Sequence, residues 1–158
     1  MLRGNVPPDL ALFTGEGTLS GRCGLVVKRA AGVGYAMKRD MDLIRKMALA
    51  VEDAPTGYAP DDLGIEGYTD EQIAYHAHLM VQARLADGID TTYLGSSGPS
   101  AQLTSLTWDG HEFAADARDE TTWKKAMTIV QEKGGAVSLD VIKALLSHLV
   151  KAGLGLVV

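Results

Sequence analysis

The sequence predicts a mostly α-helical, α+β fold: a winged helix-turn-helix-like domain with a small β-hairpin wing, followed by a C-terminal helical hairpin. Three observations predict it. A capped amphipathic helix over 68–85 runs into a strand that ends near Ile89. A polar loop over 90–102 and a return strand over 103–106 follow it, which completes the outline of a winged helix. Two more amphipathic segments, joined by Gly134-Gly135, then form a helix pair.

The helix over 68–85 has a chemically marked start. Thr69 and Gln72 have the spacing of a capping box, in which each side chain accepts from the other residue's backbone N–H. Tyr68 and Ile73 can close as a hydrophobic staple around this cap. Gly88 offers a stop. Apolar residues at helical spacing predict the buried stripe: Ile73, Ala77, Met80, Val81 and Leu85.

Residues 1–36 differ from the rest of the chain. They are rich in glycine and small residues, and they show no sustained hydrophobic period and no secretory pattern. Their glycines lack the spacing of a phosphate-binding loop. The sequence becomes regular at Met37. We therefore expect 1–36 to be a poorly ordered N-terminal extension, upstream of a native start at Met37.

A helix is predicted over 37–53, with Asp40 as its cap and an apolar stripe facing the core. Four basic residues lie outside that stripe, where they serve either as phosphate contacts or as a solvated helix face: Lys38, Arg39, Arg45 and Lys46. The connection over 54–67 is rich in glycine and proline. It holds either a helical turn at 61–63 or a short strand at 63–65 that would complete the sheet.

The remaining helices are also marked by caps. Thr107 caps a helix from Trp108 to about Arg118, and we expect Trp108 to be a large buried anchor. Asp119 or Thr121 starts the next helix, and Ser138 starts the last. We expect a domain over 37–118, and a helical hairpin over 119–158 that either packs on it or forms a homodimer contact.

Charge and composition exclude several classes of protein. The chain of 158 residues is long enough for one domain with a core, and no run reaches the ~18 apolar residues that a membrane span needs. Cys23 is the one cysteine, so an internal disulfide is excluded and a cytoplasmic protein is expected. Residues 1–50 carry eight Lys/Arg and four Asp/Glu, whereas 51–158 carry seven and sixteen. This acidic balance is unfavourable for a nucleic-acid binder.

The sequence does not assemble an obvious catalytic, cofactor or metal site. His76 and His78 point about 200° apart on a helix, so they cannot hold one metal from one face. A row of carboxylates at helical spacing could act as acid and base, but a solvated acidic face is the commoner meaning: Asp109, Glu112, Asp116 and Asp119. We therefore expect no enzyme, no cofactor and no metal.

Several short motifs carry a resemblance to a known family. They are 37–45 (MKRDMDLIR), 65–68 (IEGY), 75–76 (YH), 79–80 (LM), 95–97 (GSS), 106–113 (LTWDGHEF), 117–119 (ARD) and 133–135 (KGG). In this order they resemble the bacterial and phage proteins of the family named domain of unknown function 2513, over about 37–158. The resemblance implies a winged-helix-like protein, often encoded among prophage genes, with no established catalytic residue. One departure is Arg84, which stands where the family has a glycine. A glycine there would end the helix in a left-handed turn, so the helix here could instead run on to 87–88.

Two functions compete. The first is a prophage-associated regulator that places 68–85 in the major groove of double-stranded DNA and the hairpin on the backbone. Its candidate contacts are Lys38, Arg39, Arg45, Gln72, Tyr75, His76, Arg84 and Tyr93. Ser96 and Ser97 accompany Tyr93 on a loop that could equally be a mobile hairpin tip. The alternative is a protein–protein interaction module that binds no nucleic acid.

Overall fold

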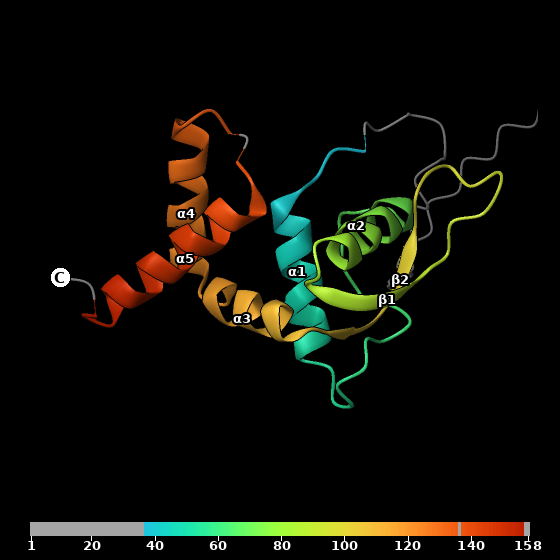
Figure 1. The fold of residues 1–158 in the computed structure, drawn as a ribbon, viewed down its shortest axis with the longest axis horizontal. Coiled ribbons are helices and arrows are strands. Elements are labelled where there is room, and N and C mark those ends of the chain that lie inside the picture. Colours follow the sequence, from blue (N-terminus) through green and yellow to red (C-terminus); the bar gives the residue numbers. More distant parts are fainter. Residues whose placement is uncertain (1–36, 136, 157–158) are drawn as a thin grey trace, which may run out of the picture. The chain divides into compact units, whose positions relative to one another are not determined.

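The computed structural model describes residues 37–135 and 137–156, which all belong to one compact unit that spans Tyr35–Val158. In these residues there are five helices and a two-stranded antiparallel sheet, on which α1, α2 and α3 pack, so the expected α+β class is confirmed (Figure 1). The expected state of 1–36 lies outside the described residues. The elements are α1 (Met41–Glu52), α2 (Asp70–Gln82), β1 (Ala86–Asp90), β2 (Ala101–Leu106), α3 (Trp108–Ala117), α4 (Glu120–Glu132) and α5 (Leu139–Gly153).

Helix α1 begins where its cap predicts, not at Met37. The Asp40 side chain accepts from the backbone N–H groups of Asp42 and Leu43, and it satisfies two of the free donors at the helix start. Residues 37–40 precede the helix, so the predicted start was too early. The buried stripe of α1 is Leu43, Ile44, Met47, Ala48 and Val51.

Helix α2 has both hydrogen bonds of the predicted capping box, between Thr69 and Gln72. Its end differs from the prediction. The helix stops at Gln82, and Arg84 adopts the left-handed turn, with φ of 57°, that a glycine would favour. The helix does not run on, and Thr107 donates hydrogen bonds to the Arg84 and Leu85 carbonyl oxygens at this turn, which favour it despite the steric cost at Arg84.

The predicted hairpin is present. β1 pairs with β2 from Ala86↔Leu106 to Asp90↔Ala101, with an irregularity between Asp87 and Gly88. Gly88 therefore lies inside a strand and is not a helix stop. A Cβ at Gly88 would lie 2.6 Å from the Gln102 carbonyl oxygen, so glycine permits the close approach of the strands.

The connection between α1 and α2 contains neither the helical turn at 61–63 nor the strand at 63–65. It touches β2 through a backbone hydrogen bond, in which the Ala59 N–H donates to the Thr104 oxygen at 2.8 Å, and through the Gln102 side chain, which donates to Asp61 at 3.3 Å. The tight turn of a helix-turn-helix motif is also absent, since residues 53–69 separate the two helices.

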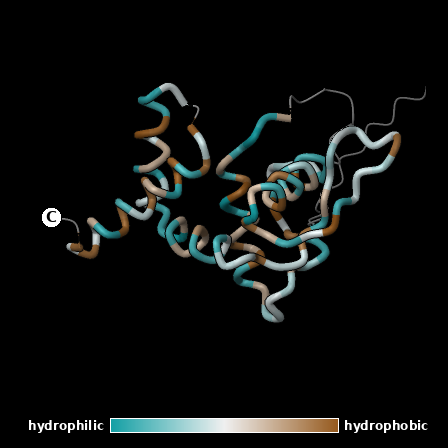
Figure 2. Tube along the Cα trace, in the orientation of Figure 1, coloured by the Kyte–Doolittle hydropathy of each residue, from teal (hydrophilic) through white to brown (hydrophobic). Residues whose placement is uncertain are grey.

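The C-terminal helices start at their predicted caps, Thr107, Asp119 and Ser138. α4 and α5 form a hairpin, and α5 packs on α3. Hydrophobic and hydrophilic residues alternate along these helices, as expected of amphipathic elements (Figure 2). None of the helices in 37–135 and 137–156 has the length and apolar character needed to cross a membrane.

The predicted burial of Trp108 was wrong. Its exposed fraction is 79%, whereas Trp123 on α4 is 2% exposed and fills the core between α1 and α3. The ring of Trp123 meets that of Phe113 edge to face, with centroids 6.3 Å apart. The buried anchor of this fold is therefore the second tryptophan.

Candidate functional site

The face formed by α2 and the hairpin is the surface that a winged helix would present to DNA. Four of the predicted contacts lie on it. Gln72 and Tyr75 are half-buried on α2, Arg84 is exposed at its C-terminal end, and Tyr93 is exposed in the loop of the hairpin. The Gln72 side chain is already engaged in the cap of α2. The residues available on this face are therefore few.

His76 is not a surface residue. It is 2% exposed, and its Nε2 accepts from the Asp40 N–H at 2.8 Å. Its Nδ1 lies 2.7 Å from the Gln72 oxygen, so the proton of the neutral ring is on Nδ1. The Tyr68 hydroxyl donates to the Asp40 carboxylate, and burial together with this carboxylate raises the pKa of Tyr68. His76 thus joins α2 to the start of α1 and cannot reach a ligand outside.

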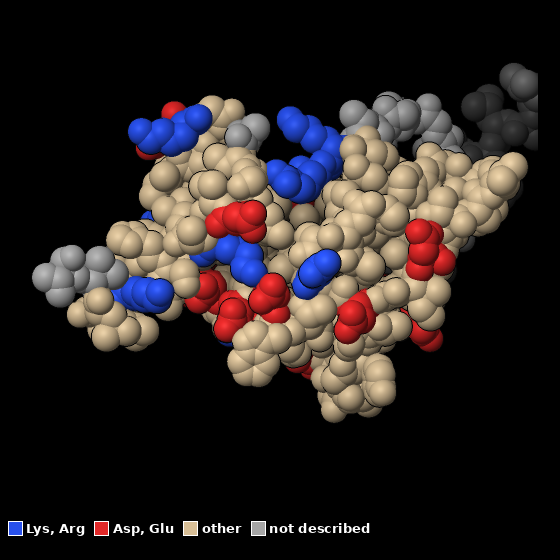
Figure 3. Space-filling model, in the orientation of Figure 1, with Lys and Arg blue, Asp and Glu red and all other residues tan. Residues whose placement is uncertain are grey.

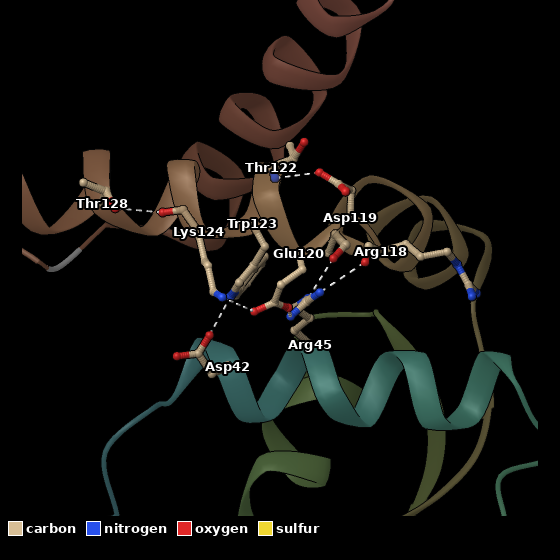
Figure 4. A network of polar contacts seen from close by, with 10 residues as sticks. Asp42, Arg45, Arg118, Asp119, Glu120, Thr122, Trp123, Lys124 and Thr128 are labelled. Atoms are coloured by element: carbon tan, nitrogen blue, oxygen red, sulfur yellow. Dashed lines mark hydrogen bonds and ion pairs between the residues drawn. The ribbon is translucent and has the colours of Figure 1, made fainter.

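Arg45 is also occupied inside the molecule (Figure 4). Its guanidinium donates to the backbone oxygens of Ala117 at 2.7 Å and Arg118 at 3.1 Å, and to the Glu120 carboxylate at 2.6 Å. It also lies over the Trp123 ring, 5.3 Å from the centroid. These contacts fix the turn between α3 and α4 on α1, which removes Arg45 from the free cations.

The same network sets the ionisation of its acidic members. Hydrogen bonds from Arg45 and Lys124 hold the pKa of Glu120 below its ordinary value. The indole N–H of Trp123 donates to Asp42 at 2.6 Å, which satisfies the polar atom of a buried side chain. This polar network is consistent with a structural role, because its charged groups are paired with one another.

Of the other predicted cations, Lys38 and Arg39 lie before α1, and Lys46 lies on α1 itself. Lys38 and Arg39 are exposed, and Arg39 donates to the Val137 oxygen at 2.7 Å, next to the start of α5. Lys46 lies over the ring of Tyr68 at 5.1 Å. Arg39 contacts the segment before α5, and Arg45 contacts the turn before α4. Neither side chain therefore adds a basic group to the face of α2.

The α2 and hairpin region carries a net negative charge. Between residues 70 and 106 the chain has one basic residue, Arg84, and four acidic residues, Asp70, Glu71, Asp87 and Asp90. On the face that Figure 3 shows, acidic side chains lie over the hairpin, and a basic group lies where α2 passes into β1. Acidic residues therefore outnumber basic ones in this region.

A solvated acidic face was expected on α3, but Trp108 was not expected to lie on that face. Gly110, Phe113, Ala114 and Ala117 are buried, and Trp108 lies on the opposite side of the helix. The signal was in the sequence, since residues nine apart point about 180° from each other, and Trp108 and Ala117 therefore could not share one buried face.

A small cleft lies beside this face. It has a volume of about 230 Å³ and lies between α3 and α5. Its walls are Glu112, Phe113, Asp116, Lys143, Ala144 and Ser147. Lys143 also faces Asp109 at 3.9 Å. In the part of the chain that the structure describes, no three His, Cys, Asp or Glu side chains are grouped so that they could hold a metal ion.

The fold and these surfaces define a small α+β protein in which three helices pack on a β-hairpin and a helical hairpin follows. The family model described as "Hypothetical protein (DUF2513)" matches residues 38–136. The chain belongs to this family, as the motifs indicated, although the match ends before α5.

An uncharacterized protein of Haemophilus influenzae (strain ATCC 51907 / DSM 11121 / KW20 / Rd) is 37% identical over 110 residues, which cover 68% of this chain and 90% of that protein. No solved structure matches the chain.

Proposed function

We propose that this protein is a winged-helix-like module for protein–protein interaction, without enzymatic activity and without a nucleic-acid ligand. The order α1, α2, β1, loop, β2 supports the winged-helix outline. The bond from Ala59 to Thr104 adds to it, because it places a backbone segment on the second edge of β2, where a complete winged helix has a third strand.

The charge of the α2 and hairpin region carries the proposal. A DNA reader neutralises several phosphates with Lys and Arg, and this electrostatic term supplies most of its non-specific affinity. Here Arg84 is the one Lys or Arg between residues 70 and 106, beside four carboxylates. Such a surface is suited to a basic protein partner, for which acidic residues provide steering and complementarity.

The second candidate is a prophage-associated DNA-binding regulator, which the winged outline favours. With His76 and Arg45 occupied inside the protein and Gln72 engaged in the cap of α2, its available contacts are Lys38, Arg39, Tyr75, Arg84 and Tyr93. Homodimerisation through the C-terminal helices stays compatible with either function. A groove of about 500 Å³ along α4, with Ile129 and Leu149 among its lining residues, offers the surface for it.

Fluorescence anisotropy with a labelled random duplex tests the choice. The full chain is titrated from low to physiological salt. We expect no binding even at low salt, because the α2 and hairpin region repels phosphate. Micromolar binding that weakens steeply with salt, and that falls in a Lys38→Ala/Arg39→Ala/Arg84→Ala variant, would favour the regulator instead.

A further inference from the structure

We infer that the outer face of α3 is a docking surface for a basic segment of a partner protein, with Trp108 as its anchor and Glu112 and Asp116 as the acceptors of the partner's Arg or Lys side chains. This inference rests on the proposed function and gives it a site.

The first observation is an exposed but oriented tryptophan. Trp108 is 79% exposed, and its indole N–H donates to the Glu112 carboxylate at 2.9 Å. This bond holds the ring along the helix surface. Large aromatic side chains are anchors of protein interfaces because they bury much area and lose little side-chain entropy on binding.

The second observation is that α3 presents Trp108 from a fixed position. Thr107, the preceding residue, donates its N–H to the Leu85 oxygen at 3.1 Å and its hydroxyl to the Arg84 oxygen at 2.6 Å. A Cβ at Gly110 would lie 1.8 Å from the Leu85 oxygen, so α3 lies directly against the turn that follows α2. An anchor on such a preorganised element pays little ordering cost when a partner binds.

The third observation is the row of acceptors beside the ring. Glu112 and Asp116 follow Trp108 at intervals of four residues, so the three lie along one side of α3. Both carboxylates line the cleft of about 230 Å³. The oxygen of Glu112 that does not hold the indole is free to accept from a guanidinium or ammonium group, and the Trp108 ring can take the same cation on its face.

The charge of the α3 surface indicates which class of partner can bind there. Asp109 lies on the cleft side of α3, and on the other side His111 lies 3.6 Å from Glu52 of α1. Lys143 is the one basic residue of the cleft wall. A basic peptide segment complements this surface, whereas a nucleic-acid backbone is repelled by it.

The test uses a labelled peptide of alternating arginine and alanine, with a glutamate–alanine peptide as its control. Anisotropy is measured on the full chain. We expect the arginine peptide alone to bind, and Trp108→Ala to weaken it about tenfold or more. Tyr58→Ala, at an aromatic residue that is 70% exposed in the loop after α1, serves as the matched control and should stay within about twofold.

A second pair of variants distinguishes binding at this site from a general effect of the protein's net charge. Glu112→Gln/Asp116→Asn should weaken the arginine peptide about tenfold. Asp61→Asn/Asp62→Asn removes the same two charges from the α1–α2 connection and should leave binding within about twofold. Equal weakening by both double variants would overturn the site, as would an unchanged affinity in Trp108→Ala.

The remaining outcomes distinguish this site from the function on which it rests. A photo-crosslinking residue is placed at the exposed position of Ala115 on α3 or of Leu94 in the hairpin loop, in the full chain in its host cell. A protein captured from Leu94 and not from Ala115 would overturn the α3 site and leave the interaction function standing. Cross-links to DNA alone would overturn both. Cross-links from Ala115 to a second copy of this chain would replace the basic partner by self-association.

Discussion

The Nε2 atom of His76 lies 2.8 Å from the backbone nitrogen of Asp40, and it accepts a hydrogen bond from that N–H group. Asp40 also caps α1 and accepts from Tyr68, so one residue joins the starts of α1 and α2. Asp40, Tyr68 and His76 all lie in motifs that carry the family resemblance. Structural contacts account for the presence of these three residues in the motifs, so no ligand is required to explain them.

Replacing His76 by alanine should destabilise the protein by about 2–3 kcal/mol, because it empties a buried site and leaves the Asp40 amide without its acceptor. Urea denaturation measures this effect. His111→Ala is the control, since the His111 side chain is 53% exposed and should change the free energy of unfolding by less than about 0.5 kcal/mol. Similar losses in the two variants would contradict the structural role of His76.

Replacing Arg84 by glycine should stabilise the protein by about 1 kcal/mol. Arg84 has φ of 57°, a conformation that costs a side-chain-bearing residue more than glycine, and this gain exceeds the entropy that glycine adds to the unfolded chain. The free energy of unfolding in urea is the measurement. At the neighbouring Ala83, with φ of −78°, the same change to glycine should be destabilising. A loss of stability in Arg84→Gly would show that its side chain makes a contact worth more than the strain.

Replacing Gly110 by alanine should destabilise the protein by about 3 kcal/mol or more. The new Cβ would lie 1.8 Å from the Leu85 backbone oxygen, and a backbone atom cannot move aside without breaking the junction of α3 with the turn after α2. Thermal unfolding followed by circular dichroism tests this. Gly98→Ala, where no atom lies within 4 Å, should leave the melting temperature nearly unchanged. A stable Gly110→Ala protein would mean that α3 can shift away from Leu85.

Glu120 should make stability depend on pH in the acid range. Its pKa is lowered by hydrogen bonds from Arg45 and Lys124, so the folded state favours the ionised carboxylate. The resulting stabilisation is present above the ordinary glutamate value of 4.5 and is lost as the pH falls through the lower, folded value. In urea midpoints measured from neutral to acid pH, Glu120→Gln should be less stable than the wild type near neutrality and should approach it in acid. A constant difference across this range would contradict the pairing.

Local chemistry predicted much of the fold, because caps and helical periods act over a few residues. Asp40, Thr69, Thr107, Asp119 and Ser138 all start helices where the sequence places them. The hairpin was also predicted, since its polar loop separates two short strands. These features depend on the neighbours of each residue along the chain.

The errors concern contacts between distant residues. Arg45 has the sequence context of a solvated helix face, yet its partners lie 72 and more positions away in the turn before α4. His76 meets Asp40 across 36 positions. Whether these two side chains were available to contact DNA depended on hydrogen bonds to residues far away in the sequence, which local sequence patterns do not reveal. The exposure of Trp108, by contrast, could have been predicted from the sequence. Trp108 and Ala117 lie nine residues apart on one helix and point in opposite directions, so they cannot share a buried face.

The opposite surroundings of the two tryptophans give the protein two internal optical probes. Trp123 lies in the core against Phe113 and Arg45, so its emission reports the packing of α4 on α1 and α3. Trp108 lies in water, and a red-shifted emission is expected from it. A ligand that covers α3 would shift the second signal to the blue and leave the first unchanged, whereas unfolding would move the first to the red. Docking and denaturation can therefore be followed separately in one unlabelled sample.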